Sequence, residues 1–332
     1  MRALPLCAGL LLFGGCGDRS GGRAPLPGVL VIRPPHEVSA LALQGETVWA
    51  GGREGLFRLD RRDGRPLATP APPAPLEWVK ALLVDPDGAL WVGHSHGLSV
   101  YDGAGWRTLT TADGLPDPRV NCLLRDRRGR LWVGTWGGAA VLEGGRWNAL
   151  RRGDGLLDDM VHVMLESSDG ALWFGSYVAP RGGLSVWKDG RWSRFTVAEG
   201  LPHNNVNGLA QDREGSVWAA TGLLDRGGAC RFRERDGSWA LDRVLTRADG
   251  LAGDKVRSVF QDRDGLYWLG SEYDGVARYD GSRFRILTEA DGLSGQETKM
   301  AVQDSEGTLW LATNNGVTRL GPEALRALRA GA

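Results

Sequence analysis

Seven polar residues recur at one position of a repeated pattern, and they are the strongest candidates for chemistry in this 332-residue chain. When the apolar stretches that end in a turn, usually at Asp, are aligned on that end, the residue five positions earlier is polar in every stretch. These residues are Ser39, Lys80, Asn121, His162, Asn207, Arg257 and Lys299. A core-facing position would be apolar in most repeats, so we expect this position to open toward a wet central channel.

The residue types of this ring indicate what the channel could bind. Three cations and one histidine favour an anionic or heavily hydroxylated ligand, because their side chains can donate hydrogen bonds to carboxylate, sulfate or sugar oxygens. The alternative is that the seven side chains only solvate the mouth of the channel. The sequence alone favours neither interpretation.

A second group of candidates falls in the loops expected on the same face as the ring. They are His94, His96, Trp136, Tyr177, Arg181, Asp225, Arg226, Glu272, Tyr273, Asp274, Asn314 and Asn315. Segments 177–183 and 222–228 break the repeat period, so we expect them to be the specificity loops. For any single residue of this group, an ordinary solvated loop side chain is the competing interpretation.

Two local motifs are interpreted as turns, without catalysis or metal binding. Residues 93–97 (GHSHG) match the G-x-S-x-G nucleophile pattern, but that pattern works only on a strained strand-to-helix turn, and this segment occupies a strand-turn-strand position. Residues 85–88 (DPDG) and similar segments lack the further ligands and terminal Glu of a calcium loop. We therefore expect no catalytic residue, metal or cofactor.

The elements that must position these residues repeat seven times. A strand centred on Trp recurs every 41 to 50 residues, at Trp49, Trp91, Trp132, Trp173, Trp218, Trp268 and Trp310. Each unit reads as four short strands separated by Gly or Asp-Gly turns, which is typical of an antiparallel meander. One such sheet cannot bury both faces, so the units predict blades stacked around an axis. We expect the seven Trp side chains to pack between blades, although aromatic faces could also stack on sugars.

The two ends of the repeat region predict how the ring closes. The last unit stops after residues 316–320 without a fourth strand, whereas residues 29–33 form an unpaired apolar strand before the first unit. We expect this N-terminal strand to complete the seventh blade, which removes an exposed sheet edge. The predicted fold class is an all-β, seven-bladed β-propeller of four-stranded antiparallel blades over residues 29–321, followed by a tail at 322–332. In the first unit, the Pro-rich stretch 65–75 replaces the fourth strand.

Charge and cysteine content narrow the choice of partners. The 40 basic and 40 acidic residues cancel, and no run of like charge is long enough to follow a phosphate backbone, so we expect no nucleic acid partner. Cys122 and Cys230 fall in distant units, and we expect no disulfide between them.

The first residues predict export and a lipid anchor. Arg2 precedes an apolar stretch that ends at residue 15 and is too short to span a bilayer, so residues 1–15 read as a signal peptide. Residues 12–16 (LFGGC) resemble a bacterial lipobox, which predicts lipidation of Cys16, with ordinary secretory cleavage as the alternative. Residues 16–28 read as a Gly/Pro-rich tether. The expected location is an outer membrane or periplasm-facing membrane surface, contacted only through the lipid anchor.

One unit is the basis of a family resemblance. Residues 261–271 (QDRDGLYWLGS), followed by 275–281 (GVARYDG) and 291–293 (DGL), resemble the two-component regulator propeller repeat. This resemblance implies an exported propeller of the kind that serves as the ligand-sensing ectodomain of hybrid histidine kinases, often for oligosaccharides. No transmembrane, kinase or receiver segment follows Leu320, so we expect the chain to need a partner to signal across a membrane.

These observations support three hypotheses on function. The leading one is a monomeric, membrane-anchored, ligand-binding or sensor-type propeller that takes a small molecule or an oligosaccharide. The alternative is a protein-interaction scaffold on the same ring, whose partner would be a protein. The third is a lyase resembling the virginiamycin-inactivating propellers, which is least favoured because no unit has a distinctive acid/base pair.

Overall fold

Each repeat of the sequence forms one four-stranded antiparallel sheet around the strand that carries its Trp. The computed structural model describes residues 26–178 and 180–330. The predicted signal peptide, Cys16 and most of the predicted tether therefore lie outside the described residues.

The sheets follow one another along the chain, each written here from its innermost strand outward. The first three are β2 (Val38–Gln44), β3 (Thr47–Gly52), β4 (Gly55–Asp60) and β5 (Pro66–Leu67); β6 (Ala81–Val84), β7 (Leu90–His94), β8 (Gly97–Tyr101) and β9 (Trp106–Leu109); and β10 (Val120–Arg125), β11 (Leu131–Thr135), β12 (Gly138–Glu143) and β13 (Arg146–Leu150). The next two are β14 (Val161–Glu166), β15 (Leu172–Ser176), β16 (Gly183–Lys188) and β17 (Arg191–Phe195); and β18 (Val206–Gln211), β19 (Val217–Leu223), β20 (Arg226–Arg235) and β21 (Ser238–Leu245). The last two are β22 (Val256–Gln261), β23 (Tyr267–Ser271), β24 (Val276–Tyr279) and β25 (Phe284–Leu287); and β26 (Thr298–Gln303), β27 (Leu309–Thr313), β28 (Gly316–Leu320) and β1 (Val29–Ile32).

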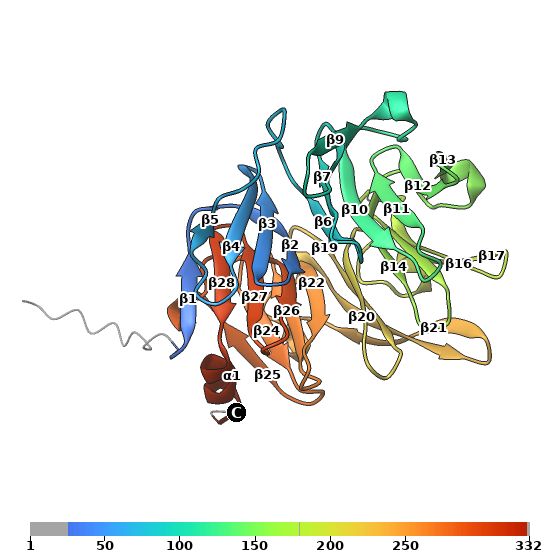
Figure 1. Ribbon diagram of the computed structural model, residues 1–332. Helices are drawn as coiled ribbons and strands as arrows, with labels where there is room; N and C mark the ends of the chain where they lie inside the picture. Colours follow the sequence, from blue (N-terminus) through green and yellow to red (C-terminus); the bar gives the residue numbers. More distant parts are fainter. Residues whose placement is uncertain (1–25, 179, 331–332) are drawn as a thin grey trace, which may run out of the picture.

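The seven sheets form a closed ring, as the sequence predicts. Each innermost strand contacts the innermost strand of the next sheet, and β26 returns to β2. Strand β1 lies beside β28 at the outer edge of the seventh sheet, with Val29 opposite Leu320 and Ile32 opposite Val317 (Figure 1). The backbone N–H of Gly321 also donates to the carbonyl of Gly28 at 3.0 Å. The N-terminal strand therefore completes the last blade, and the two ends of the ring meet there.

The anchor Trp of every blade is held by the residue that ends the preceding innermost strand. Each indole Nε1 donates a hydrogen bond of 2.7 to 3.1 Å to the side chain five or six residues earlier, which is Asp in five blades, Gln in the first and Ser in the fourth. Six of the seven Trp side chains are buried, and Trp91 is partly buried. The recurrent Asp therefore satisfies the polar atom of a large core residue that would otherwise be buried without a partner.

A small residue two positions after the Trp lets neighbouring blades approach closely. At Gly93 a Cβ atom would lie 2.5 Å from Val120 of the next blade, and at Gly175 it would lie 2.7 Å from Val206. Real Cβ contacts are longer than this, so the Trp-x-Gly spacing reflects packing between blades.

A short 3₁₀ turn fixes the loop that leads into each of the third to seventh blades. The turns are η1 (Thr111–Asp113), η2 (Arg152–Asp154), η3 (Val197–Glu199), η4 (Arg247–Asp249) and η5 (Glu289–Asp291). In η1 the Asp113 carboxylate accepts from the Thr110 backbone N–H at 2.9 Å, and Gly114 takes a left-handed φ of 101°. Leu115 follows and is buried. The Asp-Gly-Leu motif is therefore a turn whose Leu side chain packs into the core just before the next innermost strand.

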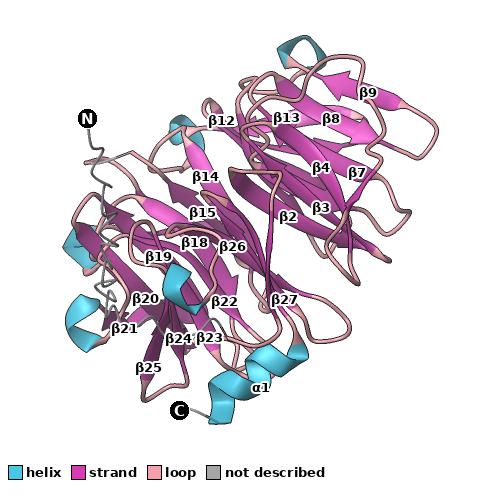
Figure 2. Cartoon of the chain, turned by 90° about the vertical axis from the view of Figure 1, so that its left-hand side faces the viewer, coloured by secondary structure: helices cyan, strands magenta, loops and turns pink. Residues whose placement is uncertain are grey.

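One detail of the blades differs from the sequence-based expectation. The first blade keeps a fourth strand, because Pro66 and Leu67 pair with Leu59 and Arg58, although only over two residues. The tail after the ring forms α1 (Pro322–Ala330), which lies at the edge of an otherwise almost entirely β molecule (Figure 2). Leu325 and Leu328 of α1 pack into the core beside the seventh blade, so burial of this apolar side stabilises the short helix.

The Trp anchor predicts a specific stability effect. Asp212 accepts from Trp218 Nε1 at 2.8 Å, from the Ser216 N–H at 2.7 Å and from the Tyr267 hydroxyl of the next blade at 2.9 Å. We expect Asp212→Ala to lower the free energy of unfolding by about 3 kcal/mol in urea titrations, because three donors lose their partner. The exposed Glu214 of the same turn is the control, and Glu214→Ala should change this free energy by less than about 0.5 kcal/mol. Equal effects of the two substitutions would contradict the anchor.

Candidate functional site: the channel mouth

The polar ring predicted from the sequence coincides with a repeated distortion of the innermost strands. In six blades the register between the innermost and second strands shifts at this one residue, as between Val120 and Cys122 or between Val256 and Ser258. The skipped residues are Ser39, Asn121, His162, Asn207, Arg257 and Lys299. A β-bulge leaves one residue out of the ladder and re-aims its side chain. Lys80 precedes β6 directly and donates its backbone N–H to Gly93 at 2.9 Å.

The two ring asparagines are used to join blades. The Asn121 amide donates to the Val161 carbonyl of the next blade at 3.0 Å. Asn207 likewise donates to the Val256 carbonyl at 2.7 Å. Both side chains are buried. Each amide holds the backbone beside the ring residue of the following blade, so these two members of the ring are structural at least in part.

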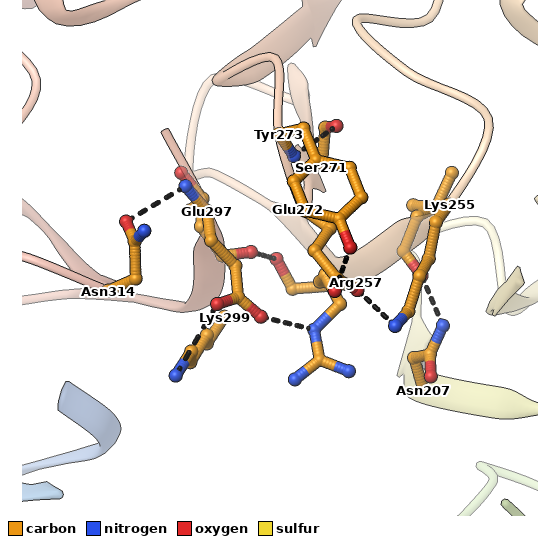
Figure 3. Close-up of polar contacts among 12 residues, drawn as sticks. Asn207, Lys255, Arg257, Ser271, Glu272, Tyr273, Glu297, Lys299 and Asn314 are labelled. Carbon is orange, nitrogen blue, oxygen red and sulfur yellow. Dashed lines mark hydrogen bonds and ion pairs between the residues drawn. The ribbon is translucent and has the colours of Figure 1, made fainter. Parts of the chain in front are cut away.

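Three cations of the sixth and seventh blades converge with carboxylates at the mouth (Figure 3). Arg257 Nε lies 2.7 Å from Glu297. Lys299 Nζ lies 2.8 Å from Glu37 and 3.5 Å from Glu297. The buried Lys255 pairs with Glu272, whose second oxygen accepts from the Tyr273 hydroxyl at 2.8 Å. Most of the positive charge expected from the sequence is therefore matched by acidic side chains.

These carboxylates reveal a second tier of the ring that the sequence analysis missed. Glu37, Lys255 and Glu297 each lie two residues before a ring position. The residue between the two tiers is buried Val in six blades and Thr298 in the seventh. A Val or Thr flanked by two polar residues at the start of five of the seven innermost strands is the signal that would have found this tier, since alternate residues of a strand share a face.

His162 lies in the electrostatic field of this cluster. Burial, together with the positive charges of Arg257, Lys80 and Lys255, lowers the pKa of His162 to about 3. Its ring lies 5.0 Å from that of Tyr177, whose hydroxyl accepts from Lys255 at 3.2 Å. Burial alone would raise the pKa of Glu272, but the hydrogen bond from Lys255 outweighs this effect and keeps that pKa below its ordinary value. His162 is thus a neutral hydrogen-bonding group at physiological pH.

Lys80 has a different environment from the other cations of the ring. Its side-chain amine forms no hydrogen bond or ion pair with any of the described residues, although the more distant Glu37 attracts it. Burial and the nearby Arg257 and Lys299 lower its pKa. Lys80 lines a cavity of about 200 Å³ between the second and third blades, with Ser95, Arg119, Asn121 and the indoles of Trp78 and Trp136. Of these residues, Trp78, Ser95 and Arg119 were not predicted as site residues.

Two of the loop predictions need correction. His94 is the last residue of β7 and is buried, with Nε2 2.9 Å from the Ser99 hydroxyl, and burial lowers its pKa to about 4. Segment 222–228 is not a long loop, because β19 and β20 pair as far as Leu223 and Arg226. Asp225 therefore lies in a tight turn at the tip of a hairpin, where the neighbouring Leu224 has a φ of 54°.

The remaining predicted loop residues do lie on the face that carries the mouth. Arg181, in the loop after β15, lies 3.4 Å from Asp158, and His96 is exposed beside Ser95. Asp274 follows the exposed Tyr273. Asn314 accepts from the Glu297 backbone N–H at 3.1 Å, and the Asn315 carbonyl accepts from Arg33 at 2.6 Å. Asn314 thus helps to position the acid shared by Arg257 and Lys299.

The part of the chain that the structure describes has no group of three His, Cys, Asp or Glu residues placed to hold a metal. None of its helices is long and apolar enough to cross a membrane. Cys122 and Cys230 are free thiols, and burial raises the pKa of both.

The architecture and the mouth define a seven-bladed β-propeller with a polar channel opening. The family model of the two-component regulator propeller matches residues 114–137, 200–222 and 250–273. Each match begins at the Gly-Leu turn, covers the innermost strand and ends within or just after the second strand. Three of the seven repeats therefore match the two-component regulator propeller repeat, and the predicted resemblance is confirmed.

Solved structures share this fold. The extracellular domain assigned to a hybrid two-component system of B. thetaiotaomicron superposes with a TM-score of 0.78 at 20% identity, covering 92% of this chain and 42% of that domain. This chain thus spans less than half of that relative. Virginiamycin B lyase from Staphylococcus aureus, with quinupristin, gives a TM-score of 0.66 at 14% identity over 88% of this chain and 97% of the lyase. No curated protein matches the sequence.

The low pKa of His162 predicts how stability depends on pH. The unfolded chain takes up a proton on this imidazole below about pH 6.5, whereas the folded chain does so only near pH 3, so stability is lost as pH falls through this interval. We expect this residue to contribute a loss of about 2 kcal/mol between pH 7.5 and pH 5.0 in urea unfolding. His162→Asn should remove that share of the pH dependence.

The exposed His96 provides the control, and His96→Asn should change the pH dependence of unfolding less than His162→Asn does. A His162→Asn protein that loses as much stability between the two pH values as the unchanged protein would contradict the assignment of a partly buried, neutral imidazole.

Proposed function

We propose that this protein is an exported, membrane-anchored, ligand-binding propeller of the sensor type, and that it recognises a hydroxyl-rich oligosaccharide at the channel mouth. The proposal concerns binding, without catalysis. It follows the leading hypothesis from the sequence, with one change. Because the acids of the second tier match most of the ring cations, the main mouth suits hydroxyl groups better than a highly charged anion.

The observation that carries the proposal is the alternation of donors and acceptors around one opening. Lys255, Glu272 and Tyr273 form one connected set, and Arg257, Glu297 and Lys299 form the next. A sugar hydroxyl is both a donor and an acceptor, so it can bridge such a carboxylate and a neighbouring cation. Side chains held by ion pairs and by strand bulges need little reordering on binding, which favours affinity.

The comparisons support the sensor class in coarse terms. Among the structures that share this fold, the extracellular domain of a hybrid two-component system aligns with most of this chain. An extracellular location would agree with the signal peptide and the lipobox predicted from residues 1–16. The similarity to the lyase, at 14% identity, is one of fold and adds nothing in favour of an enzyme.

A protein partner is the second candidate function, and one observation favours it. Four large apolar side chains are exposed in the face loops, namely Trp78, Trp136, Leu224 and Tyr273. Exposed aromatic residues near polar groups are common in protein interfaces. A protein partner would contact residues across this whole face, whereas binding of an oligosaccharide would depend on the residues of the channel mouth.

The oligosaccharide proposal predicts selective loss of binding. On a glycan array, the purified protein should bind a restricted set of oligosaccharides, and calorimetry with the strongest of them should show affinity falling by about tenfold or more for Arg257→Gln. Tyr273→Phe, which removes one hydroxyl, should have a smaller effect. Arg146→Gln makes the same change at an exposed arginine beyond β12, on the opposite face, and should leave the affinity as it is. Binding that survives Arg257→Gln in a folded protein, or no binding to any glycan, would overturn the proposal.

A further inference from the structure

The cavity between the second and third blades differs from the rest of the mouth in both charge and shape. Elsewhere the cations are in contact with acids, but the amine of Lys80 forms no ion pair or hydrogen bond within residues 26–178 and 180–330, and Glu37 acts on it only from a distance. The same cavity is walled by two of the most exposed aromatic side chains of the face, Trp78 at 44% and Trp136 at 39% exposure. Flat apolar walls thus flank a positive charge that no acidic side chain contacts.

Both tryptophans are held in place by arginines. The Arg119 guanidinium lies 4.3 Å from the centre of the Trp136 ring, and Trp136 Nε1 donates to Asn121 at 3.2 Å. The Arg119 guanidinium donates hydrogen bonds of 2.8 and 2.7 Å to the Asp117 carboxylate, which fixes its position and balances its charge. Cation–π contact and hydrogen bonding fix the indole in position, so its exposed area is preorganised for contact with a ligand.

Trp78 is placed in the same manner but at a cost in backbone energy. The Arg53 guanidinium lies 5.1 Å from the centre of its ring. Its φ of 53° is in the left-handed region, which bulky side chains rarely adopt and which is costly. The residue two positions before the ring is Glu or Lys in three other blades, so an exposed Trp in this strained conformation is not required by the repeat. Strain of this kind is often found at functional sites.

Trp78 also separates two hollows on this face. On its other side lies a cavity of about 580 Å³ bounded by Arg53, Glu54 and the end of the Pro-rich segment of the first blade. A ligand longer than one ring could therefore pass along Trp78 from one hollow into the next. This shape favours an extended chain of rings over an isolated small anion.

We propose that the Trp78–Trp136 cavity is a subsite for one negatively charged sugar ring of an extended oligosaccharide, such as a uronic acid or a sulfated residue. The indoles contact the apolar faces of the ring, and Lys80 binds the carboxylate or sulfate. Asn121 and Ser95 lie within reach of ring hydroxyls. This subsite rests on the proposed function. It assigns the position at which the acidic sugar of an oligosaccharide would bind, at a mouth whose other cations are paired with acids.

Matched ligands test the subsite directly. The probes are oligogalacturonides and their carboxyl-reduced counterparts, which differ only in whether each ring carries a carboxylate or a hydroxymethyl group, together with sulfated glycosaminoglycan oligosaccharides as the second source of charge. By calorimetry with the purified protein, we expect at least one acidic probe to bind about tenfold more tightly than its uncharged counterpart, with a preference that weakens as salt increases.

Three substitutions separate the contributions. Lys80→Met, which keeps an unbranched side chain, should abolish the preference for the charged probe while neutral binding persists. Trp136→Ala should weaken the charged and neutral probes alike, by about tenfold. Leu224→Ala removes an exposed apolar side chain from the same face outside the cavity and should leave both affinities as they are. Circular dichroism melting should show that all three proteins are folded.

The outcomes distinguish this inference from the broader proposal. If oligosaccharides bind but Lys80→Met keeps the charge preference, or Trp136→Ala leaves affinity intact, the subsite is wrong while an oligosaccharide-binding mouth stands. If Arg257→Gln abolishes binding and neither cavity substitution has an effect, the ligand lies only at the main mouth. No binding of any probe overturns both proposals.

Discussion

The hydrogen bond from each anchor indole to the side chain that ends the preceding innermost strand is the constraint on which this structure depends. The seven Trp side chains are buried or partly buried between blades, and each carries a polar N–H that needs a partner. Because an Asp at the strand end supplies that partner, it also fixes where the strand stops and where the turn begins. The length of every innermost strand, and so the height of its bulge in the channel, follows from this contact.

The bulges turn a regular fold into a site. Without them, every second residue of an innermost strand would point between blades, and a polar side chain there would be costly. Skipping one residue at the same height in six blades gathers polar groups at one opening. The charges are then divided unevenly around the opening. Glu37 and Glu297 of the second tier, together with Glu272 of a face loop, balance the cations of the sixth and seventh blades. Lys80, between the second and third blades, has no acid in contact.

Much of this could be predicted from the sequence because it repeats. The blades, the closing strand and the ring of polar residues each follow from a pattern seen several times. Features that occur once were harder to find. Trp78 looked like any residue of a loop, because nothing in the sequence marks a left-handed backbone conformation at a Trp. His94 looked exposed beside His96, because one residue decides whether a side chain at a strand end faces the core or water. The pairing of Glu297 with Arg257 joins different blades, and their relative height is set by packing.

The seam between β1 and β28 has a further consequence. Val29 faces Leu320, and Gly28 contacts the start of α1, so the first and last parts of the ring are neighbours although nearly the whole chain separates them. In a closed ring of this kind the chain could begin at another blade, while the order of the blades around the ring stays the same. A circular permutant that joined the two ends and opened at a hairpin turn on the face away from the mouth would retain every sheet and the channel opening, while moving the one discontinuity of the backbone to another blade.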